Sequence, residues 1–192
     1  MKVLHLHLAP GEATERHQHT RPYIFVSLVP GKISNEVRGR TPKTSELEYG
    51  ELRSSKGGFA LAERNGGYAP LDLVVVELQK EVAPASQFTS EEADFKYHNV
   101  IVGHLLDGQG WRAYEINIAS EGYTEKHLEL YNRLMIAVSE VNLQMDVAAK
   151  GKSLLQLQPG DVRWFEGGDT VSSVNKGNGP AKFIVIEFSR GE

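Results

Sequence analysis

Short runs in which apolar and polar residues alternate dominate the sequence. Leu4, Leu6 and Leu8 alternate with histidines, and a period of two places such side chains on one face of a β-strand. Continuous apolar runs rich in β-branched residues, at 73–76 and 183–186, are typical of strands covered on both faces. Glycine and proline separate the runs. The pattern predicts an all-β fold of the sandwich or barrel type.

The second half of the chain repeats the first at a constant offset of 110 residues. Residues 14–17 align with 124–127 without a gap, and Asn65 aligns with Asn175. One offset over so many positions is typical of a duplicated domain. We therefore expect an N-terminal barrel, a linker and a C-terminal barrel, at 1–82, 83–110 and 111–192.

The linker is the one part of the sequence in which a helix is expected. Ser90 precedes two glutamates, and a serine at this position can cap a helix whose positive end favours acidic side chains. We therefore expect a small helix within 90–95. Two linker histidines, His98 and His104, have no partner at ligand spacing and are expected at the surface.

A set of glycine, histidine and asparagine residues recurs at similar spacing in the two halves. These residues are Gly11, His17, His19, Gly50, Gly58 and Asn65 in the first half, and His127, Gly160, Gly168 and Asn175 in the second. Their positions resemble the two sequence motifs of the cupin superfamily, over nearly the whole chain apart from the linker. The resemblance implies two tandem double-stranded β-helix barrels, also called jelly rolls.

The resemblance is incomplete at the metal ligands. In the family, three histidines and one glutamate converge inside the barrel on a divalent iron, manganese, nickel or zinc ion, and such ligands suit these ions. The first half keeps His17 and His19, whereas Tyr23 and Leu61 stand at the other two positions. Residues two apart on a strand share a face. The resemblance therefore implies a small-molecule pocket in the N-terminal barrel, lined by these four side chains.

Two imidazoles are fewer than the three protein ligands of a typical catalytic metal site. Tyr23 is one candidate for a further ligand, and His5 and His7 on the neighbouring strand are the others. The alternative is that His17 and His19 hydrogen-bond to Tyr23 or to water and hold no metal. The sequence leaves both alternatives open.

The second half keeps less of the ligand set. His127 matches the family pattern, but Glu129, Arg133 and Val171 replace the other ligands. Arg133 would place a fixed positive charge where a cation binds, unless Glu129 pairs with it. We therefore interpret the second barrel as structural, with a degenerate site, and expect any chemistry within residues 1–80.

Composition excludes several classes of function. The chain has no cysteine, so disulfides, thiolate metal sites and cysteine nucleophiles are ruled out. The net charge is −4 and the basic residues are scattered, so neither a nucleic acid nor an anionic membrane is an expected partner. No apolar run reaches the length of a membrane span or of a signal peptide. A cytoplasmic protein is expected.

Several functions remain open at this point. A metal-dependent oxygenase or isomerase using His17 and His19 would act on a small organic acid, phenol or sugar. A metal-free enzyme could use a histidine as general base and Tyr23 as acid. A binding module would capture the small-molecule ligand without turnover, as in a sensory protein, and a purely structural role or a homodimer are further alternatives. Fold alone does not choose between them.

Overall fold

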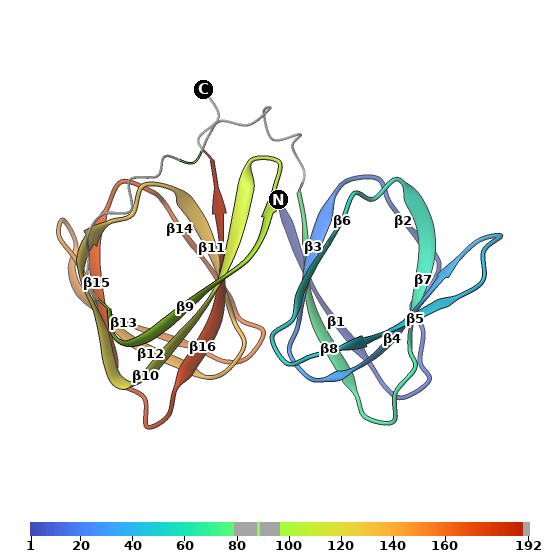
Figure 1. The fold of residues 1–192 in the computed structure, drawn as a ribbon, viewed down its shortest axis with the longest axis horizontal. Coiled ribbons are helices and arrows are strands. Elements are labelled where there is room, and N and C mark those ends of the chain that lie inside the picture. Colours follow the sequence, from blue (N-terminus) through green and yellow to red (C-terminus); the bar gives the residue numbers. More distant parts are fainter. Residues whose placement is uncertain (79–87, 89–96, 190–192) are drawn as a thin grey trace. The chain divides into compact units, whose positions relative to one another are not determined.

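Antiparallel β-strands form two units in a computed structural model of the chain that describes residues 1–78, 88 and 97–189. The units span Met1–Glu81 and Val82–Glu192 (Figure 1). The all-β prediction is confirmed. The helix expected within 90–95 falls outside the described residues. Within the described part of the chain, no helix is long and apolar enough to cross a membrane.

The first unit is built from two four-stranded antiparallel sheets, with strand orders β1-β8-β3-β6 and β2-β7-β4-β5 (Figure 1). Its strands are β1 Lys2–Leu8, β2 His17–His19, β3 Tyr23–Ser27, β4 Gly31–Val37, β5 Lys43–Leu47, β6 Leu52–Ser55, β7 Phe59–Asn65 and β8 Leu71–Glu77. Leu8, Leu71 and Leu73 of the first sheet pack in one cluster with Ile33 and Leu47 of the second. The apolar core therefore lies between the two sheets.

The strands of the second unit form one continuous sheet, because its longest strand, β10, pairs with both β15 and β16. The hydrogen-bonded order of the strands is β13-β12-β15-β10-β16-β11-β14, and β9 also pairs with β10. The strands are β9 Tyr97–Gly108, β10 Trp111–Leu128, β11 Asn132–Ala137, β12 Val141–Val147, β13 Gly151–Leu157, β14 Val162–Phe165, β15 Thr170–Asn175 and β16 Ala181–Phe188.

Strand pairing in the two units follows the offset found in the sequence. Each pair of neighbouring strands in the first unit has a counterpart about 110 residues later in the second. Leu8 pairs with Leu71 as Ile118 pairs with Ala181, His17 with Leu61 as His127 with Val171, and Tyr23 with Glu77 as Arg133 with Glu187. The offset therefore relates contacts in three dimensions as well as residue types.

Strand β9 lies within the segment expected to be the linker. It occupies 97–108 and pairs with β10 over most of its length. The two strands are joined by a tight turn at Gln109 and Gly110. A Cβ atom on Gly108, just before this turn, would lie 2.0 Å from the indole ring of Trp111, so glycine suits this close approach. His98 lies 3.2 Å from Glu125, and His104 is an exposed side chain 2.9 Å from Asp107.

A buried asparagine ties the strands of each unit together. Asn65 Nδ2 donates to the carbonyls of Leu8 and Ala69 at 3.0 and 2.8 Å, and its Oδ1 accepts from the Gly67 amide at 2.8 Å. Asn175 makes the same three kinds of bond in the second unit, to Ile118, Gly179 and Gly177. This explains the recurrence of asparagine at both positions.

Replacing Asn65 with alanine should destabilise the first unit by about 2–3 kcal/mol. The substitution removes three hydrogen bonds and leaves the buried Leu8 carbonyl without its partner. Urea denaturation measures the change, and Asn35→Ala on β4 is the matched control, expected to stay within ~0.5 kcal/mol of the wild type. Equal stability of the two variants would contradict this role.

Candidate functional site

Three potential metal ligands meet inside the first unit, on strands β2 and β7. His17 and His19 point to one side of β2 because they are two residues apart. Strand β7 pairs with β2 so that Leu61 lies opposite His17, and Glu63 follows Leu61 on the same face of β7. Ligand atoms of His17, His19 and Glu63 all lie within 4.8 Å of one another.

The distances within this cluster are short. His17 Nε2 lies 2.9 Å from His19 Nε2, and the Glu63 carboxylate oxygens lie 3.4 Å from His17 Nε2 and 3.6 Å from His19 Nε2. His19 and Glu63 are buried, whereas the His17 side chain is 41% exposed. The cluster is therefore reached from solvent on the His17 side.

The hydrogen bonds of the outer ring nitrogens determine what the inner ones offer. His17 Nδ1 lies 2.9 Å from the Glu15 carbonyl oxygen, which can only accept, so Nδ1 carries the proton and Nε2 of the neutral ring has a lone pair. His19 Nδ1 lies 3.3 Å from Glu77 Oε1, in a poorly aligned contact that still favours a proton on Nδ1. The two Nε2 atoms are within hydrogen-bond distance of each other, so one donates to the other unless a cation lies between the rings and the Glu63 carboxylate.

Neighbouring residues fix the positions of these ligands. Thr14 Oγ1 donates to Glu63 Oε2 at 3.2 Å and accepts from the Glu63 amide at 3.0 Å. The Gly58 amide donates to the His19 carbonyl at 2.6 Å. Gly57 has a φ of +67° and approaches Arg21 so closely that a Cβ would lie 2.2 Å from its carbonyl oxygen. The β6–β7 turn therefore requires glycine where it supports His19.

Comparison with known proteins adds structural relatives only. No protein-family model matches the sequence, and no curated protein sequence matches it either. Among solved structures, AerE from Microcystis aeruginosa aligns with 98% of this chain and 87% of its own, at 13% identity and a TM-score of 0.71. Procruciferin, an 11S globulin from Brassica napus, aligns with 97% and 75%, at 10% identity and a TM-score of 0.71.

A third structure belongs to Bacillus subtilis oxalate decarboxylase and comes from a study of that protein's Mn(II) centres. It aligns with 99% of this chain and 69% of its own, at 12% identity and a TM-score of 0.67. This chain has a cupin fold. At such low identity the likeness shows the fold and leaves the activity open, since the similar structures include both an oxalate decarboxylase and an 11S globulin.

Within the cupin fold, the structure shows where the other candidate ligands lie. Tyr23 stacks on His19 with ring centroids 4.2 Å apart, and burial raises the pKa of its phenol despite a hydrogen bond with Ser55. It forms a neutral wall beside the cluster. His5 and His7 are 52% and 64% exposed and approach Asp72 instead, so they do not complete the ligand set. Leu61 is buried beneath His17.

The glutamate that does join the cluster was missed by sequence comparison. The cupin motif places its last histidine at the position of Leu61, and the motif has no ligand at any other position of this strand. Glu63 lies two residues farther along the same strand, and the period of two keeps its side chain on the same face. A search for ligating residues along the whole inward face of β7 would have found it.

The corresponding cluster of the second unit is an ion-pair chain. His127 Nε2 lies 3.0 Å from Glu129 Oε1, and Glu129 Oε2 lies 3.1 Å from Arg133 Nη1, so Glu129 pairs with Arg133. Ser173 occupies the strand position of Glu63 and hydrogen-bonds to Thr124 at 3.0 Å. Among the described residues, no group of three potential metal ligands forms here.

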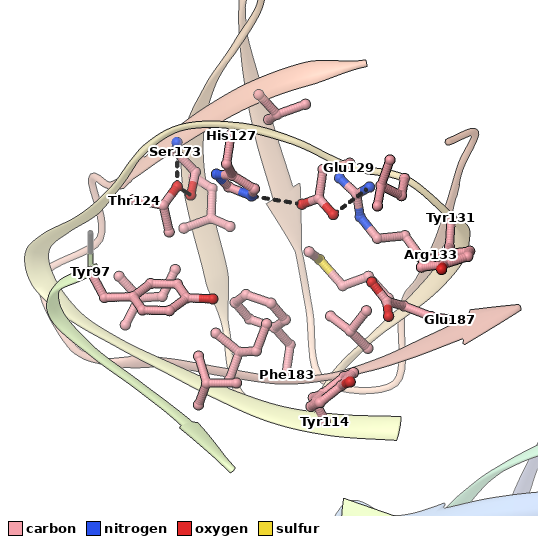
Figure 2. A pocket seen from close by; sticks show the side chains of 18 of the residues that line it. Tyr97, Tyr114, Thr124, His127, Glu129, Tyr131, Arg133, Ser173, Phe183 and Glu187 are labelled. Atoms are coloured by element: carbon pink, nitrogen blue, oxygen red, sulfur yellow. Dashed lines mark hydrogen bonds and ion pairs between the residues drawn. The ribbon is translucent and has the colours of Figure 1, made fainter. Parts of the chain in front are cut away.

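The second unit nevertheless contains a partly open cavity of about 600 Å³. Figure 2 shows the His127–Glu129–Arg133 chain along one side of this cavity, with Tyr114 and Phe183 across from it. Val171 also lines the wall. The second barrel, in which we expected a degenerate site, therefore keeps an interior space with polar groups although it lacks the metal ligands.

The ion-pair chain shifts the pKa values of two of its members. Burial lowers the pKa of His127, but hydrogen bonds to the Glu129 side chain and the Glu125 carbonyl outweigh burial and raise it. Burial raises the pKa of Glu129, but the His127 hydrogen bond and the charge of Arg133 lower it overall. Both shifts favour the charged pair.

The stabilising effect of His127 should therefore depend on pH. A raised histidine pKa contributes stability that is fully present below the unfolded value of 6.5 and is lost as pH rises through the folded pKa. We expect the difference in unfolding free energy between wild type and His127→Gln to fall as pH rises above 6.5. Urea denaturation across this range measures it, and a difference that grows with pH would contradict the assignment.

Proposed function

We propose that the first unit binds a divalent transition-metal ion through His17, His19 and Glu63 and uses it to transform a small organic acid. The observation that carries this proposal is the convergence of two imidazole Nε2 atoms and a carboxylate, 2.9 to 3.6 Å apart. Without a cation these electron-rich atoms would repel one another. A proton shared by the two rings is the metal-free alternative.

The donor set fits a catalytic centre better than a structural one. Two imidazoles and one carboxylate form a three-ligand set that leaves coordination positions open, as in non-haem iron enzymes. Manganese, iron, nickel and zinc all accept such ligands. When bound, the metal supplies Lewis-acid activation of a substrate oxygen, or activation of water or dioxygen.

Residues of the chain then provide the surroundings of the metal. The Glu15 carbonyl accepts a hydrogen bond from His17 Nδ1, which orients this ring and raises its basicity, and the Glu77 carboxylate lies 3.3 Å from His19 Nδ1. Tyr23 covers the ring of His19 and excludes water from that side. The exposed side of His17 leaves a path for substrate. The Mn(II) centres of the oxalate decarboxylase neighbour support a metal in this fold.

Metal analysis of reconstituted protein tests the binding half of the proposal. The chelator-treated chain is loaded in turn with Mn²⁺, Fe²⁺, Ni²⁺ or Zn²⁺, desalted, and measured by elemental analysis. We expect about one bound ion per wild-type chain and only background for His17→Ala/His19→Ala. His5→Ala/His7→Ala, an exposed pair with the same spacing, is the control and should bind like the wild type. Equal metal content in all three proteins would overturn the proposal.

Turnover tests the catalytic half. Small carboxylates are incubated with the loaded wild type and with the loaded His17→Ala/His19→Ala variant, and products are followed by NMR. We expect conversion only with wild type. A carboxylate that stabilises the loaded wild type in a thermal shift assay without any conversion would support ligand capture instead.

A further inference from the structure

The cavity of the second unit plays no part in the proposed metal chemistry, yet its walls are chemically divided. Figure 2 shows charged groups on one side, among them Glu129, Arg133 and Glu187. Other parts of the wall are apolar and include Met135, Met145 and Phe183. A volume of about 600 Å³ lies in the range of small-molecule sites.

Arg133 is the central polar group of this cavity. The residue is only 5% exposed, and its guanidinium carbon lies 5.1 Å from the centre of the Phe165 ring. Its Nη1 atom is 3.1 Å from Glu129 Oε2, but among the described residues it makes no well-aligned hydrogen bond. A guanidinium has five N–H donors in a planar fork, so Arg133 offers a buried cation with donor capacity in the cavity wall.

A second arginine is held rigidly in the same wall. Arg112 Nε donates to Glu187 Oε2 at 2.6 Å. Its guanidinium carbon lies 4.5 Å from the ring centre of Phe88 and 5.3 Å from those of Tyr114 and Tyr131. Stacking on aromatic rings fixes the plane of a guanidinium, which reduces the entropy lost when its other N–H groups bind a ligand.

The charges around the cavity favour an anion. Arg112 and Arg133 are balanced by Glu129 and Glu187, and the raised pKa of His127 adds positive charge. Burial raises the pKa of Glu187, despite its hydrogen bond with Arg112, which weakens the negative side. His104, also in the wall, faces Asp107. With His127 protonated, the two arginines, the two glutamates and His127 together carry one more positive than negative charge, and a bound anion would neutralise it.

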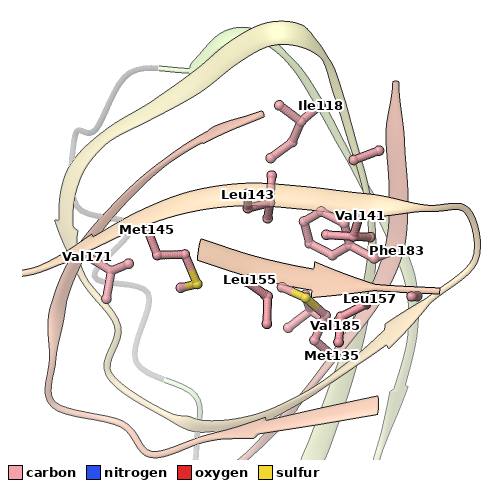
Figure 3. Close-up of a cluster of buried hydrophobic side chains, with 12 residues drawn as sticks. Ile118, Met135, Val141, Leu143, Met145, Leu155, Leu157, Val171, Phe183 and Val185 are labelled. Atoms are coloured by element: carbon pink, nitrogen blue, oxygen red, sulfur yellow. The ribbon is translucent and has the colours of Figure 1, made fainter. Parts of the chain in front are cut away.

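The apolar part of the cavity wall suits a hydrocarbon body. Met135, Met145, Leu143, Phe183 and Val185 belong to the buried core of the unit and also line the cavity. Figure 3 shows both methionines among the apolar side chains of this cluster. Methionine adapts to ligands of different shape because its side chain is unbranched and flexible.

We infer that the second unit binds, without a metal, a small monocarboxylate that carries an aromatic or branched aliphatic body. The carboxylate accepts hydrogen bonds from Arg133, and the body packs against the methionines and Phe183. Arg133 stands at the strand position of Tyr23, and Ser173 at that of Glu63. A fixed guanidinium thus supplies the positive charge that a metal supplies in the proposed centre of the first unit.

The three methionines of the chain allow a direct test. Two of them, Met135 and Met145, line the cavity, and the third is Met1. The full chain is labelled with ¹³C at the methionine methyl groups and titrated with 3-phenylpropanoate in the presence of EDTA. We expect saturable shifts of the Met135 and Met145 signals, driven by the phenyl ring current, and none of the Met1 signal. The neutral 3-phenylpropanamide should bind at least ~10-fold more weakly, because it lacks the charge-assisted hydrogen bonds.

Variants separate this site from the metal centre. Glu129→Gln/Arg133→Gln removes both members of the ion pair and should weaken phenylpropanoate binding at least ~10-fold. Val171→Phe fills the cavity and should abolish binding. His17→Ala/His19→Ala should leave the titration unchanged, and the methionine spectrum of each variant reports whether the second unit is folded. Equal binding of acid and amide, no shift up to ~5 mM, or loss of binding in the His17→Ala/His19→Ala variant would overturn the inference.

Discussion

Replacing Glu63 with glutamine should lower the affinity of the first unit for a divalent transition-metal ion by at least about 100-fold. The substitution keeps the size of the side chain but removes the only carboxylate of the cluster, and a neutral amide is a much weaker ligand for such ions. The Thr14 hydroxyl can still hold the new side chain, so the fold should be retained. Competition with a chromophoric chelator measures the affinity.

A matched control keeps this result specific. Glu46→Gln changes an exposed glutamate of β5, which pairs with Lys32, and should bind metal like the wild type. Glu77→Gln should have an intermediate effect, about 10-fold, because Glu77 orients His19 without entering the cluster. If Glu63→Gln bound metal as tightly as the wild type, the third ligand would have to come from elsewhere.

Replacing Arg133 with leucine should destabilise the second unit by about 3 kcal/mol. The substitution leaves the largely buried Glu129 carboxylate with His127 as its remaining charged partner, and an uncompensated charge of this kind is costly. Restoring charge balance with Glu129→Gln in the same chain should recover most of the lost stability, because a neutral pair has no such desolvation cost.

Urea denaturation of the two single variants and the double variant gives this coupling as a double-mutant cycle. The exposed pair of Lys150 and Asp169, 2.7 Å apart, provides the control cycle and should show less than about 1 kcal/mol of coupling. A coupling for Glu129 and Arg133 as small as that of the surface pair would show that the chain of ion pairs does not stabilise the second unit.

The strands and their turns could be predicted because the signals are local. Alternation of apolar and polar residues identifies a strand such as β1, and glycine at a tight turn has few substitutes, as at Gly57. The recurrence of Asn65 and Asn175 also has a local cause, since each side chain satisfies the backbone of one turn and of a neighbouring strand. Residues of this kind recur in the sequence wherever the same backbone conformation or turn recurs.

Strand β9 was hidden by the repeat itself. The run Val100 to Val102 is rich in β-branched residues, but an offset of 110 gives it no counterpart in the first unit. The segment was therefore assigned to the linker. Its pairing with β10 depends on contacts with a partner strand across the turn at Gln109 and Gly110, and the similarity of the two halves contains no information about this pairing.

The candidate site was predicted only in part, for two different reasons. His17 and His19 stand at their motif positions, whereas Glu63 enters the cluster from a position that the motif does not use. The cavity of the second unit depends on how side chains such as Met145 and Phe183 fill the interior. A count of metal ligands in the sequence says nothing about that volume.

A crystal structure of the metal-loaded chain, with anomalous scattering recorded at the absorption edge of the bound metal, would locate the ion. We expect one strong anomalous peak in the first unit, about 2.0–2.3 Å from His17 Nε2, His19 Nε2 and a carboxylate oxygen of Glu63. An anomalous peak at other residues, or imidazoles of His17 and His19 that remain hydrogen-bonded to each other in saturating metal, would contradict it.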